Sequence, residues 1–253
     1  MDSPAHSPAN SPAHLPAHPP ALLPKGAESE DGAVRRVRWQ QGCRIVPTRY
    51  PAINLFDRVA DEADFEALYA LEAMSNERAR DALGHVGRVA REDRIYGPGS
   101  GPVMAAFTHL NVLGSRFSAG HYGVFYAAHE RATAVAETRY HHGRFLAATA
   151  QPATHLPMRL YAVAIDARLH DLRPPGSAPT AVYDADDYGP AQALGGRLHA
   201  AGSAGVVYRS VRHARGHCVG LFKPRGASAC VHAAYLLYAW DGQRFTDVYE
   251  KTA

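Results

Sequence analysis

The sequence predicts an α+β fold, in which a twisted, mostly antiparallel sheet is flanked by helices. Three observations lead to this prediction. Of the 253 residues, 46% are hydrophobic and 20% are charged, a balance typical of a soluble chain that forms a core. Strand-like and helix-like segments are interspersed without the regular alternation of a doubly wound sheet. The last two strand-like segments flank an Asp241-Gly242 turn, which is typical of a hairpin.

Residues 1–33 differ from the rest and are predicted to be a disordered tail rich in proline, alanine and histidine. A four-residue unit repeats in it, from Ser3-Pro4-Ala5-His6 to Leu15-Pro16-Ala17-His18. Proline at every fourth position removes backbone donors and keeps the preceding residue out of the helical region. The histidines are spread along a chain that would have to fold to chelate a metal, so no metal site is expected. The folded domain is placed at residues 34–253.

The folded part is predicted to begin at about Val34, and residues 34–39 lead into a short strand-like run over residues 43–46, before Pro47. Residues 61–74 carry acidic side chains first and then apolar ones at near-helical spacing, which indicates a helix. A glycine- and proline-rich loop over 97–102 and a short apolar element over 104–110 follow.

The middle of the chain holds the densest pattern. Glycines bracket Arg116 and lead into a strand that includes Tyr126, and the alanine-rich segment 129–138 directly after it indicates a helix. Small residues on this helix allow close packing, and Glu137 falls near the packed face. The remaining elements are a helix and five strands. The helix is expected at 190–202, and the strands at 158–165, 205–208, 218–222, 231–240 and 243–249.

Composition and motifs exclude several classes of function. The net charge of +3 without a dense basic stripe argues against a nucleic-acid partner, and no signal for membrane insertion or secretion is recognised. Three cysteines without a C-x-x-C pair fit a reducing cytoplasm, and Cys218 and Cys230 lie in apolar, strand-like surroundings where thiols are usually inert. The nucleophile elbow, the zinc protease motif and the phosphate-binding loop are all missing.

Five polar residues remain where strands end, and their order resembles the RES domain. The resemblance lies in three runs: Gly114-Ser115-Arg116-Phe117-Ser118, then Gly123-Val124-Phe125-Tyr126-Ala127-Ala128 followed by Ala136-Glu137, and Gly205-Val206-Val207-Tyr208-Arg209-Ser210-Val211-Arg212-His213. The ordered set is arginine, arginine, tyrosine, glutamate and serine, at Arg44, Arg116, Tyr126, Glu137 and Ser210. The chain differs from the usual family pattern at Phe117 and Ser118, which replace Trp and Asn, and at Ala214-Arg215-Gly216, which replaces a Pro-Gly-Gly turn.

The resemblance implies an ADP-ribosyltransferase-like fold, NAD as substrate rather than cofactor, and a toxin paired with an antitoxin that carries an Xre-like helix-turn-helix. It implies catalytic roles for Glu137, Tyr126 and Arg116, and NAD binding by Arg44, Arg116, Tyr126 and Ser210. Cleavage of the nicotinamide–ribose bond develops positive charge on the ribose, which a fixed carboxylate stabilises. Arginine forks suit the diphosphate, and Tyr126 offers a ring to nicotinamide or a hydroxyl to ribose.

Each candidate also has a simpler interpretation. Arg116 could form a structural ion pair with Glu137, Tyr126 could be ordinary strand core, and Ser210 could cap a turn. Arg49 is a rival to Arg44 as the first arginine, and Gln192 and Tyr188 are weaker candidates for the pocket lining. Four histidines lie near the site in sequence, and solvated or hydrogen-bonded rings are the simpler interpretation for them. They are His121, His129, His141 and His142.

Three functions stay open at this stage. The first is consumption of NAD by hydrolysis or phosphorolysis, the second is transfer of ADP-ribose to a protein, and the third is a module that binds NAD or an antitoxin without catalysis. Convergence of the five polar residues on one cleft would favour the enzymes.

Overall fold

The structure is a computed structural model that describes residues 31–49, 55–75 and 84–251. Most of the predicted tail lies outside the described residues. Strand β1 begins at Ala33, one residue before the predicted start of the folded domain. Asp31 also contacts this domain, because its carboxylate oxygen lies 2.9 Å from Arg197 Nη2 and its carbonyl oxygen 2.9 Å from His170 Nδ1.

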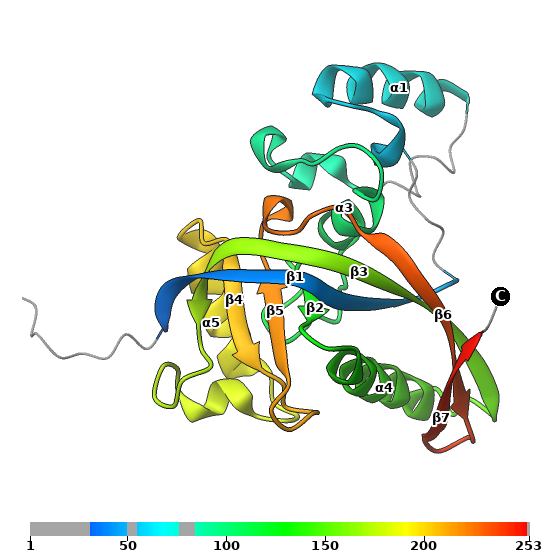
Figure 1. Cartoon of the computed structure of the whole chain (residues 1–253), viewed down its shortest axis with the longest axis vertical. Helices are drawn as coiled ribbons and strands as arrows, with labels where there is room; N and C mark the ends of the chain where they lie inside the picture. The colour runs from blue at the N-terminus through cyan, green and yellow to red at the C-terminus, as the bar shows by residue number, and fades with distance from the viewer. Residues whose placement is uncertain (1–30, 50–54, 76–83, 252–253) are drawn as a thin grey trace, which may run out of the picture.

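Seven strands form one sheet in the order β1-β2-β5-β4-β3-β6-β7, and β1 pairs with β3 as well as with β2. The long strands β1 (Ala33–Pro47) and β3 (Thr154–Asp171) run side by side across the molecule (Figure 1). Neighbouring strands are antiparallel except β3 and β4, so the predicted α+β fold with a mostly antiparallel sheet is confirmed. The other strands are β2 (Phe125–Ala128), β4 (Gly205–Arg209), β5 (His217–Leu221), β6 (Val231–Trp240) and β7 (Phe245–Lys251).

The four longer helices of the described residues are α1 (Glu62–Ser75), α3 (Gly101–Thr108), α4 (Arg131–Ala148) and α5 (Gly189–Ala200). Three of them pack against strands of this sheet, whereas α1 lies away from it (Figure 1). Short 3₁₀ turns connect them. These are η1 (Phe56–Arg58), η2 (Val86–Arg88), η3 (Arg91–Asp93), η4 (Thr180–Tyr183) and η5 (Pro224–Gly226).

Three predicted boundaries were wrong. The loop expected over 97–102 ends earlier, because α3 begins at Gly101 and tolerates Pro102 in its first turn, where the missing N–H has no helical partner. Strand β3 extends beyond the predicted 158–165 at both ends, because β1 and β6 pair along it. Helix α4 continues past the predicted end at 138, and Gly143 within it packs towards the rings of Phe245 and Trp240 instead of ending it.

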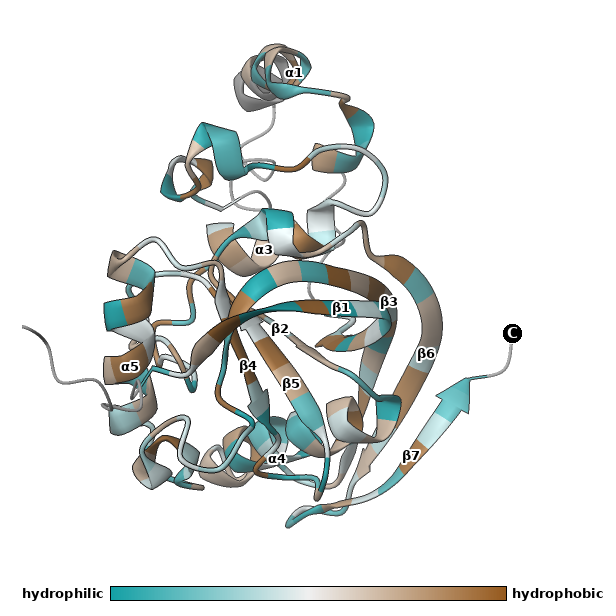
Figure 2. Cartoon of the chain, turned by 60° about the vertical axis from the view of Figure 1, so that its left-hand side comes forward, coloured by the Kyte–Doolittle hydropathy of each residue, from teal (hydrophilic) through white to brown (hydrophobic). Residues whose placement is uncertain are grey.

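Two apolar clusters hold these layers together. One joins α3 and the turn η1 to the sheet through side chains such as Phe56, Met104 and Phe107. The other joins α4 and α5 to the sheet through Leu146, Leu194 and neighbouring strand residues. Figure 2 shows hydrophobic segments along the central strands and mixed colours on the outer helices. The candidate site lies on the side of the second cluster, where α4 packs against β1 and β2.

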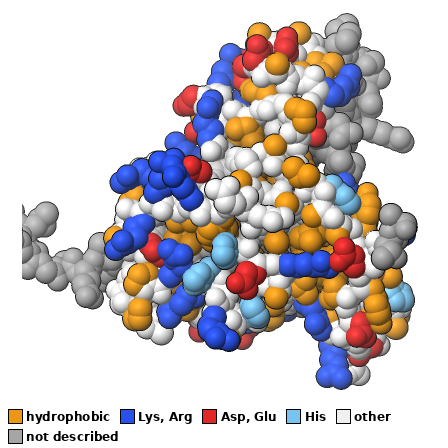
Figure 3. All heavy atoms as spheres, viewed as in Figure 1, with side chains coloured by type: hydrophobic (Ala, Val, Ile, Leu, Met, Phe, Trp, Pro, Cys, Tyr) orange, Lys and Arg blue, Asp and Glu red, His pale blue; other side chains and the backbone are white. Residues whose placement is uncertain are grey.

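The described residues include no helix with the length and apolar content that a membrane crossing needs. Acidic and basic side chains are intermingled over the face shown in Figure 3, in keeping with the small net charge. Recognition of a charged ligand therefore has to be argued from individual placed residues.

Candidate active site

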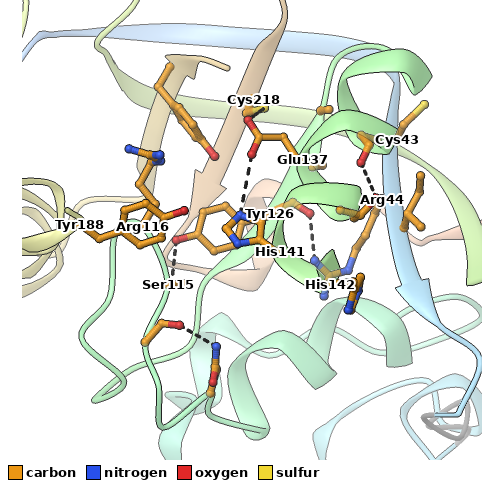
Figure 4. A pocket seen from close by; sticks show the side chains of 18 residues that line it. Cys43, Arg44, Ser115, Arg116, Tyr126, Glu137, His141, His142, Tyr188 and Cys218 are labelled. Atoms are coloured by element: carbon orange, nitrogen blue, oxygen red, sulfur yellow. Dashed lines mark hydrogen bonds and ion pairs between the residues drawn. The ribbon is translucent and has the colours of Figure 1, made fainter. Parts of the chain in front are cut away.

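A cavity of about 290 Å³ lies between α4, the strands β1, β2, β4 and β5, and the loop that precedes β2. Four of the five ordered polar residues line it, namely Arg44, Arg116, Tyr126 and Glu137 (Figure 4). The fifth, Ser210, is not part of the lining, but its hydroxyl donates a hydrogen bond to Glu137. Residues that are 166 positions apart in sequence thus meet at one site.

The loop that carries Arg116 is fixed by its backbone and by α5. Gly114 has a φ of +75°, a left-handed conformation that favours glycine. Gln192 donates from Nε2 to the carbonyl oxygen of Ser115 at 3.0 Å. A Cβ at Gly195 would lie 2.2 Å from the carbonyl oxygen of Phe117, so glycine allows α5 to approach the loop. Gln192 therefore supports the loop from outside the cavity lining.

Arg116 is buried, with 5% of its surface exposed. Its Nη1 donates to the carbonyl oxygens of Val182 at 3.1 Å and Asp184 at 2.9 Å, and its guanidinium lies 4.5 Å from the centroid of the Tyr188 ring. Its Nη2 is buried without a hydrogen-bond partner. Among the described residues no carboxylate forms an ion pair with it, which excludes the structural pair with Glu137.

Arg44 projects from β1 into the same cavity. Its Nη1 donates to the carbonyl oxygen of Tyr126 at 2.9 Å, and its guanidinium lies 4.5 Å from the centroid of the Phe125 ring. Its Nε is buried without a partner, and burial lowers the pKa of Arg44 from its usual value. Within the described ranges it also has no carboxylate partner. Each of these two cavity-lining arginines thus keeps one buried nitrogen without a hydrogen-bond partner among the described residues.

Tyr126 is held by its hydroxyl. The backbone N–H of Phe117 donates to it at 3.0 Å, and Ser115 Oγ lies 2.9 Å from it. Burial raises the pKa of the Tyr126 phenol well above its usual value, so the group is protonated at neutral pH. Since the oxygen accepts from the amide, its own proton can be donated to Ser115 or to a ligand.

Glu137 stands on α4 with 17% of its side chain exposed. Its Oε1 accepts a hydrogen bond of 2.7 Å from Ser210 Oγ and lies 4.0 Å from Cys218 Sγ. Ser210 Oγ also accepts from the backbone N–H groups of Arg212 at 3.1 Å and His213 at 2.9 Å. Ser210 therefore caps a turn, as the simpler interpretation expected, and at the same time fixes the orientation of Glu137. The Oε2 atom faces the cavity side near His141.

Of the weaker candidates Tyr188 and Arg49, only Tyr188 is part of the cavity lining. Tyr188 lines the cavity, and its hydroxyl is buried without a partner. Arg49 does not line the cavity, and its guanidinium lies 5.8 Å from the centroid of the Phe145 ring. Of the two rival arginines near the end of β1, it is Arg44 that reaches the site.

Sequence reasoning gave too little weight to His141 and His142, which both line the cavity. His121 and His129 are not part of the lining. Partial burial of the ring and the positive charge of Arg212 and Arg116 lower the pKa of His141 from its usual value, and burial lowers that of His142 to about 4. The signal in the sequence was helical spacing, since His141 follows Glu137 by four residues, but the helix had been predicted to end at Thr138.

The thiols at the site are poor nucleophiles. Burial and the nearby Glu137 carboxylate raise the pKa of Cys218 well above its usual value, and burial raises that of Cys43. Among the described residues no three His, Cys, Asp or Glu side chains gather in a way that could hold a metal ion. The arrangement offers one fixed carboxylate, two arginines with unsatisfied nitrogens and a protonated phenol around a single cavity.

The family model of the RES domain matches residues 88–241, which is more than half of the chain. The chain belongs to the RES domain family. The match covers Arg116, Tyr126, Glu137 and Ser210, while Arg44 precedes it.

Two known proteins are similar to this RES domain chain. It is 24% identical over 214 residues to the uncharacterized protein y4oC of Sinorhizobium fredii, covering 81% of this chain and 85% of that protein. It is 13% identical to a chain in the crystal structure of the M. tuberculosis MbcT–MbcA toxin–antitoxin complex, covering 87% of each chain with a TM-score of 0.44.

The residues at which the chain departs from the usual RES pattern are not part of the cavity lining. Phe117 is fully buried, with its ring 4.9 Å from that of Tyr208. Ser118 Oγ donates to the carbonyl oxygen of Tyr122 at 2.7 Å. Arg215 has a φ of 63°, a conformation in which glycine would be less strained.

Proposed function

We propose that this RES domain consumes NAD by breaking the bond between nicotinamide and ribose. One observation carries the proposal. Arg44 and Arg116 each keep a buried nitrogen without a partner, and both reach the cavity that holds the fixed carboxylate of Glu137. Unsatisfied buried cationic groups are costly, so an anionic ligand that supplies acceptors is favoured there.

The diphosphate of NAD supplies such acceptors. Arginine presents donors in a planar fork that matches phosphate oxygens, and charge-assisted hydrogen bonds of this kind are stronger than neutral ones. Arg116 already has Nη1 bound to two carbonyl oxygens, which fixes its plane and leaves Nη2 for the ligand. Arg44 is fixed in the same way by the carbonyl oxygen of Tyr126. Such fixed donors lose little conformational entropy on binding.

Glu137 is placed for the chemical step. As nicotinamide leaves, positive charge develops on the ribose ring, and a carboxylate held in a fixed orientation stabilises that charge without reorganising. Ser210 holds one carboxylate oxygen, so the other is directed to the ligand. Tyr126 contributes a protonated hydroxyl, and Tyr188 an aromatic ring with a free buried hydroxyl. Both suit the nicotinamide and ribose half of the dinucleotide.

The size of the cavity limits what enters it. At about 290 Å³ it is at the lower end of the range of small-molecule sites, roughly 300–1,000 Å³. We therefore expect the nicotinamide–ribose half to occupy the cavity and the adenosine half to extend from its mouth.

The test is release of nicotinamide from NAD by the purified chain, with Glu137→Gln as the key variant. The matched control is Glu130→Gln, which changes an exposed carboxyl group just before α4 begins. We expect the wild type and Glu130→Gln to release nicotinamide and Glu137→Gln to lose at least about 100-fold in rate. A Glu137→Gln protein as active as the wild type would refute the mechanism. Tagged NAD added to a lysate distinguishes the acceptor, since label on protein would indicate ADP-ribosyl transfer.

We also propose that the chain is a toxin held inactive in the cytoplasm by an antitoxin with an Xre-like helix-turn-helix. Family membership and the resemblance of its ordered residues support this role. Expression of the chain alone is expected to deplete cellular NAD and arrest growth, and co-expression with the product of the neighbouring open reading frame to restore growth. Growth arrest that persists in the Glu137→Gln variant would show that toxicity does not depend on this site.

A further inference from the structure

His141 lies beside the carboxylate of Glu137, and the proposed cleavage of NAD gives it no role so far. It follows Glu137 by one helical turn on α4 and lines the cavity. Its Nε2 lies 3.8 Å from Glu137 Oε2, too far for a direct hydrogen bond (Figure 4). Because Ser210 occupies Oε1, the Oε2 atom and the imidazole face each other across one side of the cavity.

The ring is oriented by its neighbours and open to solvent. It makes edge contacts with Tyr140 and Tyr188, at centroid distances of 5.4 Å and 6.2 Å. Its side chain remains 48% exposed, so water reaches it. A histidine that only fills space in a core would be buried from water.

The charges around His141 come from several elements. The groups that face it or act on it are Glu137, His142 and Arg144 on α4, Arg116 before β2, Arg212 after β4, and the hydroxyl-bearing Tyr140 and Tyr188. The cations outnumber the single carboxylate. The imidazole is therefore neutral at neutral pH, with a ring nitrogen free to accept a proton.

We propose that His141 accepts the proton of the water molecule that captures ADP-ribose, which makes the site a hydrolase. This inference rests on the proposed cleavage of NAD. The bond between ribose C1′ and the nicotinamide nitrogen breaks, and its electron pair leaves with neutral nicotinamide. The water oxygen bonds to C1′, its proton moves to His141 Nε2, and the products are ADP-ribose and nicotinamide. The imidazolium then gives its proton to solvent.

Two further features favour water as the acceptor. The cavity is small, and once the ribose half occupies it, little room is left for a protein side chain with its backbone. A neutral acceptor also needs a group that removes its proton, whereas phosphate is already anionic and needs none. The positive neighbours return the imidazolium to its neutral form after each turnover.

The experiment compares two reactions of the same protein. Hydrolysis is followed as ADP-ribose formation from NAD, and bond cleavage is followed separately as exchange of deuterated nicotinamide into NAD. The key variant is His141→Gln, and the control is His121→Gln, which changes an exposed histidine outside the cavity lining. Thermal unfolding of each variant reports on folding. A second key variant, His141→Ala, is assayed with and without added imidazole.

We expect His141→Gln to lose about 100-fold in hydrolysis. Exchange should be retained, so the ratio of exchange to hydrolysis should rise by a similar factor. His121→Gln should match the wild type, and imidazole should restore hydrolysis to His141→Ala. Added inorganic phosphate should restore turnover to His141→Gln, since an anionic acceptor needs no proton acceptor.

Three results would overturn the inference. The first is a His141→Gln protein with the wild-type rate and the wild-type ratio of exchange to hydrolysis. The second is equal loss of exchange and hydrolysis, which indicates a role in binding or in the bond cleavage itself. The third is a wild type that forms ADP-ribose phosphate and requires phosphate for any turnover. A wild type that neither releases nor exchanges nicotinamide would instead refute the proposed function, and this inference with it.

Discussion

Two arginines of strand β1 stand eight residues apart and have opposite surroundings. Arg36 is 56% exposed and forms a two-pronged pair with Asp166, with N–O distances of 2.7 Å and 2.8 Å. Arg44 contacts a carbonyl oxygen and an aromatic ring, has no carboxylate partner among the described residues, and keeps a buried Nε without a partner. On the same strand, the exposed Arg36 thus has a carboxylate partner, whereas Arg44 at the cavity has none among the described residues.

The comparison extends beyond β1. Arg173 pairs with Asp171 at 2.8 Å, while the partners of Arg116 among the described residues are carbonyl oxygens and the Tyr188 ring. We infer that Arg36 and Arg173, whose charges are paired, serve structure. Arg44 and Arg116 line the cavity without a carboxylate partner among the described residues, and we infer that they are available to a ligand. The predictions below test this division.

The largest effect is expected at Arg116. Arg116→Lys keeps the charge but loses the fork that binds the Val182 and Asp184 carbonyl oxygens and the ligand together. We expect nicotinamide release at low NAD to fall by about 100-fold or more, which is about 2.7 kcal/mol of transition-state stabilisation. Steady-state kinetics of nicotinamide release measure it. If Arg116→Lys keeps the wild-type kcat/KM, the fork is not needed for the reaction.

A smaller loss of activity, without loss of stability, is expected at Arg44. Arg44→Met replaces a partly satisfied cation with an apolar chain of similar length, so folding no longer leaves a buried guanidinium nitrogen without a partner. We expect KM for NAD to rise about tenfold, while the melting temperature stays the same or rises. Kinetics and thermal unfolding together check this. A fall in melting temperature with an unchanged KM would assign Arg44 to structure instead.

Asp171→Asn should have the reverse pattern, with unchanged kinetics and a free energy of unfolding lower by about 1–2 kcal/mol. The hydrogen bond from Arg173 lowers the pKa of the Asp171 carboxyl. Its contribution to stability is therefore present above the ordinary carboxyl pKa of about 3.9 and is lost as the pH falls through the lowered value. Urea unfolding from pH 7 to pH 3 should show the difference from wild type shrinking below about pH 4. A difference that is constant with pH would contradict this origin.

The smallest effect is expected at Arg36. Its partner Asp166 is as exposed as Arg36 itself, and solvent screens the pair. We expect Arg36→Ala to leave both the kinetics of nicotinamide release and the melting temperature within error of the wild type. Loss of activity in this variant would mean that arginines outside the cavity also contribute to the reaction.

The sequence was enough to predict the α+β class and the antiparallel hairpin of β6 and β7, because strand patterns and turn residues are local signals. It also indicated four of the residues that line the cavity, because the order of Arg44, Arg116, Tyr126 and Glu137 along the chain resembles the RES domain. What they contact could not be predicted in the same way.

Two features of the site could not be predicted from the sequence: the partners of Arg116 and the position of His141. The partners of Arg116 are the carbonyl oxygens of Val182 and Asp184, and backbone carbonyls carry no residue-specific signal in the sequence. The place of His141 depended on how far α4 continues, and the helix runs to Ala148, beyond the predicted end at Thr138.

The central claim is that the unsatisfied nitrogens of Arg44 and Arg116 and the carboxylate of Glu137 form one site for NAD. The most direct test is a crystal structure of the Glu137→Gln protein with NAD, in which slow turnover preserves the substrate. We expect the nicotinamide ribose to lie beside residue 137 and Tyr126, and the diphosphate to accept hydrogen bonds from Arg116 Nη2 and from Arg44. A dinucleotide bound elsewhere on the protein, with the cavity empty of it, would contradict the account.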